Sequence, residues 1–235
     1  MENTVGFSPK QIVVALFSVA ILLGVAHFVL FYLLLGLDID QPTWDFMGLF
    51  DLDSEISIPT WFSQMLLLLI GVLCGLVATH FRHKKAKKLY VYQWRALAVI
   101  ALFMSIDEGA AIHERMSLFI AKYTGDLSGT FFYFAWVIAG IFLVLLVVAI
   151  FFRFWWNLPP KTKWLLAAAV AVFLAGAIGV ESVAGHHMST HGIDETYRLL
   201  VLVEESLEMF GSILAIYALL DFMKTQKISL RLQVR

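Results

Sequence analysis

The sequence has few charged residues, a single cysteine and almost no imbalance between acidic and basic side chains. Only 15% of its 235 residues are charged, whereas 60% are hydrophobic, and the mean hydropathy is +0.83. An ordinary soluble domain is nearer half apolar and a quarter charged, so this composition excludes a disordered chain and a typical cytosolic enzyme. It predicts an all-α integral membrane protein.

Three further absences narrow the class of protein. The formal net charge of −1 gives no basic surface for a polyanion, so we expect no nucleic-acid partner. Cys74 lies alone in an apolar run, which excludes an intrachain disulfide and a thiolate metal cluster. The chain contains no internal repeat and no low-complexity linker, so residues 1–235 are predicted to form a single polytopic membrane domain.

Six apolar runs are long enough to cross a bilayer, which takes about 20 residues of helix. They cover approximately residues 11–35, 61–79, 94–117, 131–154, 164–184 and 197–222. The third and sixth runs contain central acidic residues, each of which is unfavourable in a membrane span. We retain both because the alternative leaves two long apolar stretches unburied, and the expected fold is therefore a six-transmembrane helix bundle.

The basic residues predict how this bundle is oriented. All but three of the 17 Lys and Arg residues fall at one end of the predicted spans, and the exceptions are Arg115, Lys122 and Arg198. Because an excess of Lys and Arg marks cytoplasmic loops, both termini are expected in the cytoplasm. The expected location is the bacterial cytoplasmic membrane, with the opposite end facing the periplasm.

The first loop at that opposite end, residues 36–60, is acidic. It carries Asp38, Asp40, Asp45, Asp51, Asp53 and Glu55. The spacing of its last three acids resembles the opening of a calcium loop, but Ile56 occupies the position where a sharp-turn glycine belongs, so we interpret it as an acidic loop. Residues 42–50 are expected to form a short interfacial helix over the bundle.

Polar side chains also gather inside the spans, in the outer half of the predicted membrane. Five spans contribute to this group: His27, Gln64, Asp107, Glu108, His113, Glu114, Glu181, Tyr197, Glu204, Glu205 and Glu208. Ionisable groups within a membrane are rare, face the bundle interior and by default mark functional sites.

Helical spacing predicts that these carboxylates converge. Asp107 and Glu114 are seven residues apart and share a helix face, as do Glu204 and Glu208 at a spacing of four. The small residues at 175–179 allow a neighbouring helix to approach the fifth span closely.

Converging carboxylates cannot all stay ionised without a partner, and the spans offer only Arg115 and Arg198 nearby. This shortfall favours a bound divalent transition metal, since carboxylate and imidazole groups are ligands for Fe, Mn, Zn or Cu. The candidate metal ligands are Asp107, His113, Glu114, Glu181, His187, Glu204 and Glu208, and the candidate catalytic carboxylates, which would move protons, are Glu108 and Glu205. His187 is included because its spacing to His191 suits one metal if the segment is helical. The Glu-x-x-His pairs of di-iron bundles are absent.

Structural explanations compete with each of these assignments. His27, alone on an apolar helix, is more typical of a packing residue, and the histidines between residues 186 and 191 are equally consistent with an exposed loop. Asp194 is a favoured N-cap for the sixth span. Arg115 and Arg198 could neutralise two of the glutamates and leave a purely structural polar network.

These observations favour a metal-dependent membrane enzyme, either an oxidoreductase or a hydrolase, that acts on a small or lipid-soluble substrate. Two other classes remain open. One is a proton- or ion-coupled transporter that uses the carboxylates as a relay. The other is a non-catalytic subunit of a larger membrane complex. The lipid bilayer is an expected partner in all three classes, and further membrane subunits are expected in the last.

Overall fold

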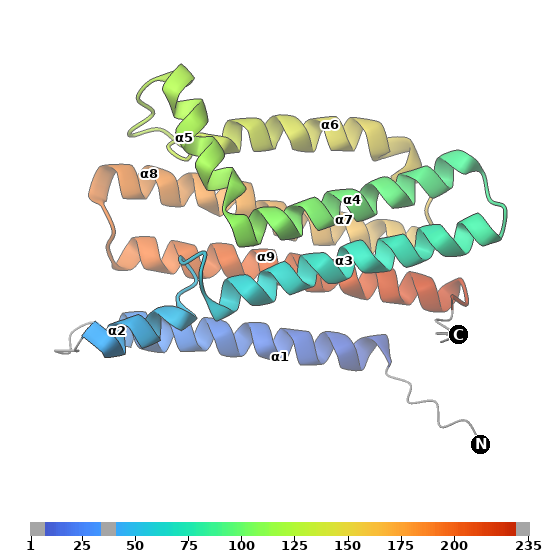
Figure 1. Cartoon of the computed structure of the whole chain (residues 1–235), viewed down its shortest axis with the longest axis horizontal. Coiled ribbons are helices and arrows are strands. Elements are labelled where there is room, and N and C mark those ends of the chain that lie inside the picture. Colours follow the sequence, from blue (N-terminus) through green and yellow to red (C-terminus); the bar gives the residue numbers. More distant parts are fainter. Residues whose placement is uncertain (1–7, 34–40, 229–235) are drawn as a thin grey trace.

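The computed structural model describes residues 8–33 and 41–228, and within these ranges the regular structure is entirely helical (Figure 1). The elements are α1 (Pro9–Phe28), η1 (Val29–Leu33), α2 (Gln41–Met47), η2 (Gly48–Phe50), α3 (Ile58–His83), α4 (Lys88–Ala110), α5 (Ile112–Thr124), α6 (Trp136–Trp156), α7 (Pro160–Leu174), η3 (Ala175–Val180), α8 (Glu181–His191) and α9 (Glu195–Thr225). The segments η1 and η3 are π-helical, and η2 is a 3-10 turn. The end of the first expected span falls outside the described residues, as do Asp38, Asp40, Arg231 and Arg235.

Five helices in these ranges are long and apolar enough to cross a membrane. They are Pro9–Phe31, Ile58–His83, Lys88–Ala110, Trp136–Trp156 and the continuous helix Pro160–His191. The longest single α-helix, α9, has 31 residues but is not among the five, and it carries Glu204, Glu205 and Glu208. The architecture is compatible with integration into a membrane.

Helix α9 forms the centre of the bundle. It packs against α1, α3, α7, η3 and α8, and Figure 1 shows it crossing α3 with the α7–α8 helix on one side and α1 on the other. Its side chains Met209, Ile213 and Ile216 are completely buried. Helix α6 lies at the periphery and exposes large apolar side chains such as Phe142 and Leu145, as a lipid-facing helix would.

The third expected span contains a break that divides it into two helices. Ala111 adopts a left-handed conformation, with φ 49° and ψ 46°, and separates α4 from α5. The carboxylate of Asp107 accepts a hydrogen bond from the backbone N–H of His113 at 2.9 Å and thereby caps the start of α5. The single helix expected over residues 94–117 is therefore wrong in this detail.

The fifth expected span is interrupted by the π-helical segment η3. Its residue Gly176 lies so close to α9 that a Cβ atom there would be 2.7 Å from the carbonyl oxygen of Glu204. Only a residue without a side chain permits this approach. The segment ends at Val180, and Glu181 begins α8 beside the central helix.

Side-chain hydrogen bonds fasten the outer segments to the bundle. Asp194 caps α9 by accepting from the N–H of Tyr197 at 2.9 Å, so the N-cap prediction is confirmed. His27 is buried, and its Nδ1 accepts from the N–H of Leu52 at 3.1 Å. The hydroxyl of Tyr197 donates to Asp53 Oδ1 at 3.0 Å. These contacts position the loop that precedes α3.

Candidate functional site

Acidic side chains from four parts of the fold meet near the end of the bundle that carries α2, α5 and α8 (Figure 1). They come from the C-terminal turn of α4, the start of α8, the first half of α9 and the loop before α3. The group consists of Asp107, Glu108, Glu181, Glu204, Glu205, Glu208 and Glu55. We call it the carboxylate cluster. Glu204 is its most deeply buried member, with 8% of its surface exposed, and the others are half-buried.

Glu181 and Glu204 form the best-defined pair in the cluster. The indole Nε1–H of Trp136, at the start of α6, donates to Glu181 Oε1 at 3.1 Å. The carboxyl group of Glu204 on α9 lies beside that of Glu181. Two ionised carboxylates at close range repel each other unless a proton or a cation compensates their charge. The pair is therefore a place where a proton or a cation would be favoured.

Asp107 and His113 form a second pair beside the first. Asp107 Oδ2 lies 3.1 Å from His113 Nδ1, while its other carboxylate oxygen caps α5. The imidazole ring meets the ring of Trp136 edge-on, with 5.2 Å between the ring centroids. Trp136 thus lies between His113 and Glu181. The two pairs form a continuous set of contacts that links α4, α5, α6, α8 and α9.

The remaining glutamates have electrostatic partners of the same sign. Glu205 interacts with Glu108 and Glu55, and Glu208 interacts with Glu205, Glu108 and Glu181. Within residues 8–33 and 41–228, no lysine or arginine forms an ion pair with any of them. Arg198 instead lies over the ring of Phe31, 5.6 Å from its centroid. The negative charge of the cluster must therefore be balanced by protons or by a bound cation.

Glu55 lies outside the helical spans, and the pKa of its carboxyl group reflects the electrostatic environment of the cluster. Burial raises the pKa of its carboxyl group to about 7, and the nearby negative charges of Glu114 and Asp107 act in the same direction. The charge of His113 opposes this shift only in part. A cation that entered beside Glu55 would favour its ionised form.

One predicted ligand, His187, lies apart from the cluster, and another, Glu114, lies at its exposed edge near Glu55. His187 Nε2 is 2.8 Å from Asp194 Oδ1, and its ring stacks on that of His191 with 4.7 Å between centroids. Both histidines belong to α8, so the segment is helical rather than a loop. Glu114 is exposed in the first turn of α5.

The described part of the chain contains no group of three His, Cys, Asp or Glu side chains that could hold a metal ion as they stand. A metal would therefore require the glutamates to change rotamer. The set of metal ligands named from the sequence stays a prediction.

Two members of this site, Trp136 and Glu55, are not identified as site residues from the sequence. Trp136 stands near the beginning of the fourth expected span, at the same depth as Glu181, and an indole N–H in an apolar environment usually needs an acceptor. Glu55 precedes α3, a membrane-length helix, by three residues, which places it at the end of that helix rather than in the middle of a long loop. The position of each residue along the bundle, at the level of the carboxylate cluster, is the signal that could identify Trp136 and Glu55 as site residues.

Comparison with known proteins gives a family but no described function. Residues 13–222 match a family described as Domain of unknown function (DUF8692). No curated protein matches the chain, and no solved structure does. Since the match extends over most of the sequence, from within α1 to within α9, the chain belongs to the family DUF8692.

Proposed function

We propose that this protein crosses the bacterial cytoplasmic membrane six times, with α9 as the sixth span and both termini in the cytoplasm. The described ends of the chain and the connections at 84–87 and 157–159 lie at one end of the bundle (Figure 1). The same end carries most of the described Lys and Arg residues, which supports a cytoplasmic location. The carboxylate cluster lies toward the other end, which would face the periplasm.

We further propose that the carboxylate cluster binds a divalent transition metal and that the protein is a metal-dependent membrane enzyme. The observation that carries this proposal is the group of five glutamates, Glu108, Glu181, Glu204, Glu205 and Glu208, with no Lys or Arg ion pair in the described structure. Burying such charges without compensation costs several kcal/mol per ion. A divalent cation would remove that penalty for two carboxylates at once.

We propose different roles for these side chains. Glu181, Glu204 and Glu208 come from two adjoining segments, and glutamate side chains have the rotamer freedom to turn toward a common ion. Asp107 and His113 would complete a carboxylate and imidazole ligand set typical of Fe, Mn, Zn or Cu. Glu108 and Glu205 are left to transfer protons to or from a small or lipid-soluble substrate, in a hydrolytic or an oxidative reaction.

Metal content of the purified protein tests this proposal. Wild-type protein, reconstituted separately with Fe, Mn, Zn or Cu and passed through a desalting column, should retain close to one or two ions per chain of at least one of these metals. Glu204→Gln and Glu208→Gln keep the side-chain volume but remove the ligand charge, so both should lose most of that metal. Glu195→Gln is the matched control, since Glu195 lies on the same helix but is exposed.

The outcomes are distinct. Loss of metal in both cluster variants, with retention in the control and unchanged elution on size exclusion, supports the site. Wild-type metal content in both variants overturns the assignment of these ligands. If the wild-type protein retains no metal under any of these conditions, the proposal of a metal-dependent enzyme is overturned.

The closeness of the Glu181 and Glu204 carboxyl groups favours one second candidate, a proton-coupled transporter. In that case Glu204→Gln should abolish proton movement across proteoliposomes that contain no added metal. Proton flux that persists in this variant would exclude the pair as a relay.

A further inference from the structure

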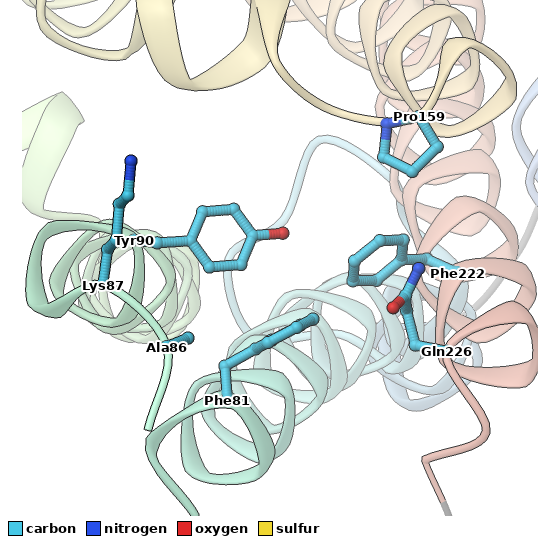
Figure 2. A pocket seen from close by; sticks show the side chains of 7 residues that line it. All are labelled: Phe81, Ala86, Lys87, Tyr90, Pro159, Phe222 and Gln226. Carbon is cyan, nitrogen blue, oxygen red and sulfur yellow. The ribbon is translucent and has the colours of Figure 1, made fainter. Parts of the chain in front are cut away.

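A pocket at the opposite end of the bundle from the carboxylate cluster suggests a second binding site. It has a volume of about 290 Å³ and lies where the end of α3, the start of α4, the α6–α7 connection and the end of α9 meet (Figure 2). This volume is near the lower end of the range for small-molecule sites, roughly 300–1,000 Å³. It can hold a part of a lipid but not a whole one.

The lining combines an apolar wall with a few polar groups. The rings of Phe81, Tyr90 and Phe222 form the wall, and Figure 2 shows the hydroxyl of Tyr90 and the amide of Gln226 facing the space between them. Lys87 stands at the rim and is exposed. Such a lining suits a molecule with a hydrocarbon part and a negatively charged group.

The charge around this pocket is positive. Lys87 lines it, and further exposed lysines lie at the ends of the helices that line it: Lys84, Lys85, Lys88 and Lys224, with Lys227 just after α9. Of the acidic residues in the described ranges, Asp221 alone lies at this end of the bundle, and it is paired with Lys161 at 2.6 Å. No described carboxylate is therefore left to neutralise the lysines at the rim.

The backbone adds to the positive potential. Helix α4 begins at the pocket with Lys87 as its N-cap, and α7 begins there with Pro159 as its N-cap. Neither N-cap makes a side-chain capping bond, and neither helix has an acidic residue in its first turn. The N–H of Tyr90 donates to the carbonyl oxygen of Lys87, so the amide groups of Lys88 and Leu89 are the ones that can donate to an anion, and the helix dipole favours one there.

Two lysines near the pocket occupy an unusual backbone position. Lys85 and Lys227 have φ values of 53° and 54° and directly follow the C-caps of α3 and α9. The next residue in each case donates back into the preceding helix, Ala86 to Phe81 and Ile228 to Met223, which is the Schellman arrangement. Glycine is the usual residue at that position because a side chain disfavours positive φ. Lysine at both positions places positive charge beside the pocket despite this conformational penalty.

We propose that this pocket binds an anionic phospholipid from the adjoining leaflet, with the phosphate at Lys87 and the first turn of α4 and an acyl segment against Phe81 and Phe222. The phospholipid, rather than a free anion, fits the apolar wall and the location at the ends of membrane-length helices. Basic pockets between membrane helices at the cytoplasmic face are suited to anionic headgroups. This site is separate from the carboxylate cluster and does not depend on a metal there.

Native mass spectrometry of the full chain in detergent tests the proposal. The protein is titrated with phosphatidylglycerol, with phosphatidylcholine of the same acyl chains, and with inorganic phosphate. We expect one tightly retained phosphatidylglycerol per chain, at least fivefold weaker binding of phosphatidylcholine, and no displacement by millimolar phosphate. Lys87→Gln should weaken the lipid about fivefold, the contribution expected of one basic residue near an anionic headgroup. Ala86→Trp, which fills the pocket from its lining, should weaken it further.

Lys10→Gln is the matched control, because it removes a lysine at the same end of the bundle that does not line the pocket. It should bind phosphatidylglycerol like the wild type. Equal binding of the two phospholipids, or wild-type affinity in both pocket variants, would overturn the proposal. Displacement by inorganic phosphate would show that the pocket takes a free anion and would overturn the lipid assignment. A melting temperature for Lys87→Gln close to that of the wild type excludes misfolding as the cause of weaker binding.

Discussion

Replacing Gly176 by alanine should separate the two helices that form the Glu181–Glu204 pair. A Cβ atom at this position would lie 2.7 Å from the carbonyl oxygen of Glu204, 3.0 Å from Glu208 Cγ and 3.1 Å from Leu207 Cβ. The carbonyl contact falls roughly 0.7 Å short of ordinary van der Waals separation, which begins at 3.4 Å. Because that oxygen belongs to the backbone of α9, it cannot move aside as a flexible side chain would. The helix itself must shift.

The expected energetic effect follows from this overlap. Overpacking a well-packed contact destabilises a protein by about 1–3 kcal/mol. For a chain of this size, each kcal/mol corresponds to a change of about 2–4 °C in melting temperature. Gly176→Ala should therefore lower the melting temperature by roughly 2–12 °C. It should also lower the retention of metal at the carboxylate cluster, because the proposed ligands lie on α9 and on α8, which directly follows η3.

Gly179→Ala supplies the matched control within the same π-helical segment. A Cβ atom there would meet nothing closer than the carbonyl oxygen of Leu174, at 4.0 Å. Thermal unfolding of both variants in detergent, followed by size-exclusion chromatography, measures the difference directly. If Gly176→Ala is as stable as Gly179→Ala and retains as much metal, then the close approach does not position the cluster and the reasoning is refuted.

Two other predictions concern Ala111, at the break between α4 and α5, and Glu55, in the loop before α3. Ala111→Gly should raise the melting temperature by about 2–3 °C, since relief of the left-handed strain, about 1.5 kcal/mol, exceeds the entropy that glycine adds to the unfolded chain, about 0.7 kcal/mol. Ala110→Gly should lower it, and an equal effect of the two variants in the same thermal assay would contradict the argument. The second prediction follows from the raised pKa of Glu55, about 7 against an ordinary value of 4.5. The folded state retains a proton there that the unfolded state has lost, so stability should fall as the pH rises from 4.5 to 7 and then level off. Glu55→Gln should reduce the decline of melting temperature between pH 5 and 8. A variant whose melting temperature falls with pH as steeply as that of the wild type would refute the contribution of Glu55.

The sequence predicted those features that depend on local composition. Apolar runs of sufficient length predicted the five membrane-length helices, and the residue type at Asp194 predicted the cap of α9. The break at Ala111 has no such signal, because alanine is the best helix former and only the tertiary fold can hold it at positive φ. The partner of Glu181 was equally hidden, since Trp136 is 45 residues away and reaches it only through the packing of α6.

The structure also changes which acidic residues need a functional explanation. Asp107 now has a structural one, because it caps α5 and pairs with His113. Asp194 likewise caps α9 and pairs with His187. Glu205 and Glu208 have no such contact in the described structure, and their strongest electrostatic neighbours are other carboxylates. Since an inert bundle would be more stable with apolar residues at these two positions, the case for a bound cation or a transferred proton rests most heavily on α9.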